Sequence, residues 1–163
     1  MKLSINSRYK MMQGLFWMLF CVSSGFISLY LQGRGLGNAE IGTVTAFFGI
    51  LAALLQPVLG GITDRSSRLT WRNMILMLAI PYLVICIVMP FVPGAWADAV
   101  FMGLLILLGN TMMPFINSAN FYYSYAGEYI NFGVARGIGS RLYALLALVI
   151  GVLAEKFGVE MEI

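Results

Sequence analysis

The chain has 163 residues, of which 60% are hydrophobic and only 10% are charged, whereas soluble domains carry about 25% charged residues. This composition excludes a soluble globular core and predicts an all-α membrane protein. The net charge is +3, but the ten basic residues form no stripe with interleaved aromatic side chains, so no nucleic-acid partner is expected. The chain has no histidine and only two cysteines, both inside apolar runs, so neither a metal site nor another cofactor is indicated.

Five apolar segments are each long enough to cross a lipid bilayer, which takes about 20 helical residues. The first follows basic residues, as in a signal peptide, but its apolar character continues past the small residues that cleavage would require, which indicates a retained helix. Small residues on the second and fifth segments also recur at helical spacing, which predicts close helix packing. The expected helices are about 11–32, 40–63, 72–91, 99–120 and 132–153.

The basic residues predict the orientation of these helices. Six lie in the N-terminal segment and in the loop between the second and third helices, and two lie on the opposite side. Because cytoplasmic loops carry the excess of lysine and arginine, the N-terminus is expected in the cytoplasm. The two groups are Lys2, Arg8, Lys10, Arg65, Arg68 and Arg72 on one side, and Arg34 and Lys156 on the other.

The loop after the second helix contains a recognisable pattern. Gly60 stands four residues before the pair Asp64-Arg65, and Arg68 follows. This resembles the G-x-x-x-D-R-x-G-R-K signature between the second and third helices of major facilitator superfamily transporters, with Ser67 in place of the second glycine and Leu69 in place of the lysine. The resemblance implies that the loop is a gate latch. A loop that only sets topology through its positive charges is the alternative.

The same resemblance implies an architecture. Transporters of this superfamily have two six-helix halves, each made of inverted three-helix repeats, with the substrate site between the halves. Residues 1–163 then correspond to an incomplete N-terminal six-helix domain, and the C-terminal half is missing. The protein is accordingly expected in a cytoplasmic membrane of bacterial type, with the lipid bilayer and that missing half as its partners.

Two arginines lie unusually deep in the fifth helix. If the helix starts near Gly133, its rise places Arg136 roughly 4 to 5 Å and Arg141 roughly 12 Å from that end. A charge at mid-helix costs about 2.5 to 3.5 kcal/mol on insertion scales, so such a side chain normally faces a cavity or a partner. Snorkelling to the headgroups remains the alternative for Arg136, and a structural partner the alternative for Arg141.

The start of the fifth helix sharpens the resemblance. Phe132-Gly133-x-Ala135-Arg136, together with Gln56-Pro57 in the second helix, is similar to the oligosaccharide:proton symporter branch, which is lactose permease-like. The branch implies that Arg136 is a sugar ligand and that Tyr143, two turns later on the same face, stacks on the sugar ring.

The fourth helix carries amide side chains in the region where the symporter branch has a carboxylate. Ser118 stands near the position of the branch's carboxylate, beside Asn117, and the nearest acid is Glu128 in the following loop. Asn110, Pro114 and Asn117 share one face, and Pro114 leaves a backbone carbonyl free beside them. This face is expected either to line the solute site or to form hydrogen bonds between helices.

The sequence therefore favours a symporter-like secondary active transporter of a small polar solute, a sugar or an oligosaccharide, with proton co-transport. The expected solute ligands are Arg136, Tyr143, Asn117, Ser118 and Arg141. An organic-anion transporter of the same superfamily and a complete five-span accessory subunit remain alternatives. An enzyme is not expected, because apart from Glu40 at the very start of the second segment the five segments contain no Asp, Glu or His that could serve as a base.

Overall fold

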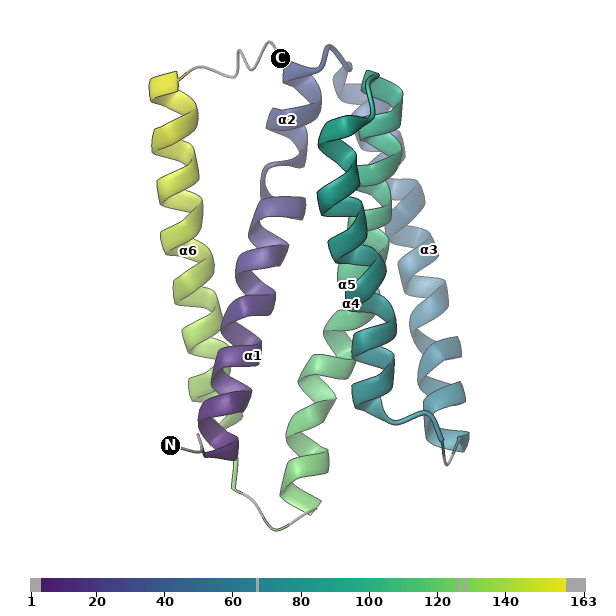
Figure 1. The fold of residues 1–163 in the computed structure, drawn as a ribbon, viewed down its shortest axis with the longest axis vertical. Helices are drawn as coiled ribbons and strands as arrows, with labels where there is room; N and C mark the ends of the chain where they lie inside the picture. The colour runs from purple at the N-terminus through teal and green to yellow at the C-terminus, as the bar shows by residue number, and fades with distance from the viewer. Residues whose placement is uncertain (1–3, 67, 126, 128, 158–163) are drawn as a thin grey trace. The chain divides into compact units, whose positions relative to one another are not determined.

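The computed structural model describes residues 4–66, 68–125, 127 and 129–157, and within them the regular structure is helical, without strands. Five helical stretches are long and apolar enough to cross a membrane (Figure 1), which confirms the all-α membrane fold class. Their bounds are Ile5–Gly33, Asn38–Arg65, Trp71–Phe91, Ala95–Tyr125 and Phe132–Lys156.

The first span starts earlier than expected and is interrupted. It consists of α1 (Ile5–Phe20), a π-helical turn (Cys21–Gly25) and α2 (Ile27–Gly33), where the sequence predicted one helix over 11–32. The early start has a local cause, because the Ser4 side chain accepts a hydrogen bond from the Ser7 backbone N–H and caps the helix. The interruption is informative because π-helical turns are rare and occur frequently at functional sites.

The fourth span, α5 (Ala95–Tyr125), is also longer than the predicted 99–120. Gly94 precedes it with a φ of 125°, a backbone conformation that glycine adopts without strain. Asp98 then lies in the first turn, where a negative charge interacts favourably with the helix dipole. The expected start at residue 99, which places Asp98 in the preceding loop, is therefore wrong.

The chain divides into two compact units. The first comprises residues 1–26 and 118–163, and in it α1 lies beside α6 (Phe132–Phe157) (Figure 1). Glycines bring the two helices together, since a Cβ on Gly14 would lie 2.7 Å from Leu142 Cδ1 and one on Gly139 would collide with Trp17. The predicted small-residue stripe contributes less than expected, because a Cβ on Gly137 would meet only open space.

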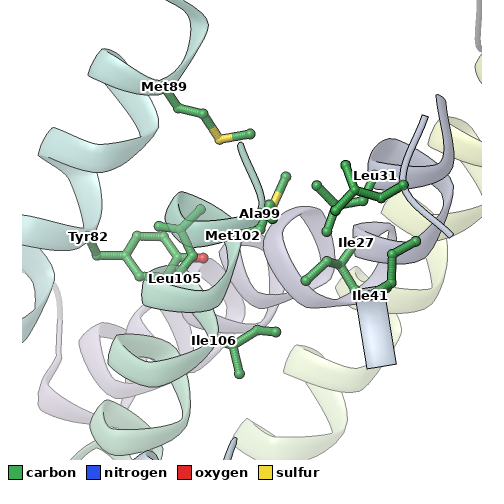
Figure 2. Packing of buried hydrophobic residues seen from close by; sticks show 10 residues of the cluster. Ile27, Leu31, Ile41, Tyr82, Met89, Ala99, Met102, Leu105 and Ile106 are labelled. Atoms are coloured by element: carbon green, nitrogen blue, oxygen red, sulfur yellow. The ribbon is translucent and has the colours of Figure 1, made fainter. Parts of the chain in front are cut away.

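The second unit, residues 27–117, contains α2, α3 (Asn38–Arg65), α4 (Trp71–Val88), a 3₁₀ turn (Met89–Phe91) and most of α5. Its buried core joins these elements (Figure 2). Gly103 of α5 admits the Phe48 ring of α3, which any side chain there would strike. The core residues are Ile27, Leu31, Leu36, Ile41, Tyr82, Met89, Ala99, Met102, Leu105 and Ile106.

A side-chain hydrogen bond joins α3 to α5 at a proline. Pro114 has no N–H to give the carbonyl four residues before it, which belongs to Asn110. The Gln56 amide Nε2 donates to this Asn110 oxygen at 3.1 Å. The carbonyl predicted to be free therefore accepts a hydrogen bond from a neighbouring helix. This favours the alternative in which this part of the α5 face forms hydrogen bonds between helices and does not line a solute site.

Replacing Gln56 with methionine should destabilise the protein by about 1 to 2 kcal/mol, because the Asn110 carbonyl loses its donor. Thermal unfolding followed by circular dichroism measures the effect. In a Pro114→Ala background, a backbone N–H becomes available to the same carbonyl, so Gln56→Met should cost clearly less there. An equal cost in both backgrounds would show that the hydrogen bond is not the cause.

Candidate solute-binding site

Two helix faces meet in the first unit and bring polar and aromatic side chains together. On α6, Arg136, Gly139 and Tyr143 follow at steps of three and four, so they share one face. On α1, Tyr9, Gln13 and Trp17 follow at steps of four. These two sets contact each other where α1 and α6 pack.

The α1 residues form a ladder of hydrogen bonds. The Trp17 indole Nε1 donates to Gln13 Oε1 at 3.3 Å, and Gln13 Nε2 donates to the Tyr9 hydroxyl at 2.9 Å. Gln13 is fully buried, and the Tyr9 ring packs edge-on against Tyr123 with ring centroids 6.4 Å apart. The ladder therefore fixes the orientation of the Trp17 ring.

Arg136 rests on that ring. Its guanidinium carbon lies 4.2 Å from the Trp17 ring centroid, within the range of a cation–π interaction, which is worth about 0.5 to 2 kcal/mol depending on desolvation. Tyr143 meets the same indole edge-on, with centroids 6.1 Å apart and an interplanar angle of 71°. Trp17 thus joins the two residues that the sequence predicted as a pair.

Tyr143 also touches the interruption of the first span. A Cβ on Gly25 would lie 2.8 Å from the Tyr143 hydroxyl oxygen, so only glycine leaves room for it. The Cys21 thiol donates to the Tyr143 backbone carbonyl at 3.6 Å. The π-helical turn is therefore fitted to α6 at Tyr143.

Arg141, the other arginine predicted as a ligand, does not take part in the contacts of this cluster. Arg141 is exposed, because five residues after Arg136 it lies on a different side of α6. In the part of the chain that the structure describes, its guanidinium forms neither an ion pair nor a hydrogen bond. Asn117 and Ser118 are half-buried on α5, and Glu128 lies outside the described residues.

The predicted gating residues lie around the end of α3. Gly60 and Asp64 are on the helix, Arg65 is its last residue, and Arg68 follows in the loop. Asp64, Arg65 and Arg68 are exposed, and the signature's Ser67 lies outside the described residues.

Hydrogen bonds join the described residues of that loop, on either side of Ser67. The Ser66 hydroxyl accepts the backbone N–H groups of Arg68 and Leu69 at 3.3 and 3.0 Å, and Asn73 Nδ2 donates to the Arg68 carbonyl at 3.2 Å. The Thr70 hydroxyl then accepts from the Asn73 N–H and starts α4. These bonds hold the turn, so the charged side chains remain available to other partners.

The second unit contains an ion pair that the sequence analysis missed. Arg34 Nε donates to Asp98 Oδ2 at 2.6 Å, and Asp98 is 1% exposed while Arg34 is 32% exposed. The pKa of Arg34 is raised above its ordinary value, which is already high. The main cause is the hydrogen bond to Asp98, and the negative charge of Asp98 is the second. The expectation that the spans offer no acid is therefore wrong, since Asp98 lies inside the fourth span, and Glu40, Asp64 and Glu155 lie near the ends of the second and fifth.

Trp17, Gln13 and Tyr9 were also missed as members of the α1–α6 cluster. The distance of Trp17 from the helix end was a usable signal, because a tryptophan that anchors a helix lies at the membrane–water interface. A glutamine four residues from both a tyrosine and a tryptophan within an apolar run was the second signal.

The comparisons with curated proteins and with solved structures found no match. A family model described as the MFS_1 like family matches residues 8–162, which is nearly the whole chain. The match includes both the Gly60–Arg68 signature and the α1–α6 cluster. The chain therefore belongs to the MFS_1 like family, within the major facilitator superfamily.

Proposed function

We propose that the protein is a secondary active transporter that moves a small neutral sugar or oligosaccharide together with a proton. Family membership indicates a transporter rather than an enzyme. The observation that carries the sugar proposal is the Arg136 guanidinium resting on Trp17, with Tyr143 against the same ring. The likeness of the Phe132–Arg136 motif to oligosaccharide:proton symporters supports the coupling to protons.

The stacked geometry suits a polyhydroxylated solute. An indole that covers one face of a guanidinium leaves its in-plane N–H groups free to donate, and this planar fork matches pairs of acceptor oxygens. The Tyr143 hydroxyl packs against Gly25 and has no hydrogen-bond partner among the described residues, so its capacity to form hydrogen bonds is unused there. Further helices of the superfamily fold would complete the cavity around these groups.

An organic-anion transporter is the second candidate. Among the described residues, neither Arg136 nor Arg141 has a carboxylate partner. An uncompensated positive charge within a membrane span needs an opposite charge from another part of the protein or from the solute. The charge of the best ligand therefore separates the two candidates.

Binding to full-length protein tests the proposal, with lactose, sucrose and melibiose as neutral probes and benzoate and citrate as anionic ones. We expect a neutral probe to bind best. Tyr143→Leu should weaken the binding of that probe about tenfold, which corresponds to the free energy of one good aromatic contact. Tyr143→Phe keeps the ring and should bind more tightly than Tyr143→Leu. The control is Tyr125→Leu, at an exposed tyrosine. Preferential binding of the anions would favour the second candidate.

We further propose that the loop after α3 is the gate latch, with Gly60, Asp64, Arg65 and Arg68 as its residues. Asp64 is one residue from the C-terminus of its own helix, where the helix dipole disfavours a negative charge. This placement supports a role toward a positively charged partner elsewhere, such as the N-terminus of a helix in the other half.

Replacing Asp64 with asparagine should lower the transport rate about tenfold and leave solute affinity nearly unchanged, because a surface latch governs the conformational change rather than binding. Uptake into proteoliposomes and equilibrium binding measure the two effects. Glu155→Gln, an exposed acid near the end of α6, is the matched control. Equal losses of rate and affinity for Asp64→Asn would contradict the latch.

A further inference from the structure

Gln13 occupies an unusual place for an amide. It is fully buried in a membrane-spanning helix, yet both ends of its amide are hydrogen-bonded to aromatic side chains of the same helix. The indole N–H can only donate, so the oxygen of Gln13 must face Trp17 and its nitrogen must face Tyr9. The ladder therefore has a single direction along α1.

The Trp17 ring is held from several sides. Gln13 binds its N–H, Gly139 leaves room for its edge, and Tyr143 packs against it. Among the described residues, Arg136 is the one whose charged group contacts the Trp17 ring. A ring fixed in this way also fixes the plane of the guanidinium that stacks on it.

We infer that Gln13 is a positioning residue for the solute site. By setting the plane of Trp17, it sets the direction in which the Arg136 N–H groups meet the solute, and it thereby determines which arrangement of acceptor oxygens the site selects. This inference rests on the proposed function, because it assigns to Arg136 the role of solute ligand. The first part of the inference, that Gln13 fixes the orientation of the Trp17 ring, can be tested without any solute.

The test uses full-length protein in which Trp71, Trp96 and any tryptophans outside residues 1–163 are replaced with phenylalanine. The fluorescence then comes from Trp17. Gln13→Met keeps the length of the side chain and removes both hydrogen bonds. We expect it to shift the Trp17 emission and to weaken binding of the best neutral disaccharide about tenfold, as expected for one buried hydrogen bond. Gln32→Met, at an exposed glutamine, is the matched control and should change neither.

A milder variant covers the case in which Gln13→Met fails to fold. Tyr9→Phe removes only the hydroxyl that accepts from Gln13 and keeps the ring against Tyr123. It should shift the Trp17 emission and the affinity in the same direction as Gln13→Met, by a smaller factor.

The outcomes separate this inference from the proposed function. Unchanged Trp17 emission in Gln13→Met, or in Tyr9→Phe if the former does not fold, would overturn the hold on the indole. A shifted emission with unchanged affinity would overturn the positioning role, while a loss of affinity in Arg136→Lys would leave the proposed function standing. If Arg136→Lys also binds normally, the sugar site itself is contradicted.

Discussion

Replacing Arg34 with leucine is expected to destabilise the protein markedly, because it leaves the buried carboxylate of Asp98 without its ion-pair partner. Asp98 is 1% exposed, and its second oxygen, Oδ1, has no hydrogen-bond partner among the described residues. Arg34 Nε donates to the other oxygen, Oδ2, and is its ion-pair partner, while the Tyr30 side chain also interacts with this carboxyl group. Chemical or thermal unfolding in detergent, followed by circular dichroism, measures the loss.

The reverse substitution should be milder. Asp98→Leu leaves Arg34, which is 32% exposed and can turn toward water or headgroups. The double variant Arg34→Leu/Asp98→Leu should recover most of the stability, because apolar pairs often replace buried ion pairs at little cost. If the double variant is as unstable as Arg34→Leu alone, the unpaired charge is not the cause.

The features that the sequence predicted well depend on local composition. Five spans follow from the lengths of the apolar runs, and their ends were right to within about six residues. The residual error lies at the caps, because a single side chain such as Ser4 extends a helix by a turn or more. The free carbonyl opposite Pro114 was also predictable, since it follows from the chemistry of proline alone.

Contacts between distant segments were not predictable in the same way. Arg34 and Asp98 are separated by 64 residues, and their pairing depends on how α2 and α5 pack. The π-helical turn at Cys21–Gly25 likewise contacts Tyr143 of another helix, 118 residues or more away in the sequence. Opposite charges in two loops on one side of the membrane were the available signal for the ion pair.

The contacts made by the proposed ligands were only partly predictable from the sequence. Arg136 and Tyr143 share a face at a spacing of seven, and the structure joins them through Trp17. Arg141 was grouped with them by depth alone, but helical geometry places it on another side of α6. Depth in the membrane and direction around the helix are independent, so both are needed to assign a ligand.

Replacing Arg136 with lysine is expected to abolish sugar binding nearly as fully as replacing it with alanine. Lysine keeps the charge but presents a compact ammonium in place of a planar fork, so it loses both the paired in-plane donors and the stacking on Trp17. We expect an affinity loss of at least about 100-fold, since hydrogen bonds to a charged group contribute about 1.5 to 3 kcal/mol each. Arg141→Lys, five residues further along α6, is the matched control and should bind normally.

The most direct test of the proposed sugar site is therefore equilibrium binding of the best neutral disaccharide to full-length wild-type, Arg136→Lys and Arg141→Lys proteins. The site described above predicts that Arg136→Lys loses binding and that Arg141→Lys retains it. Retained affinity in Arg136→Lys would mean that only a positive charge is needed. That result would contradict the sugar site and leave an anionic solute or a structural role for Arg136.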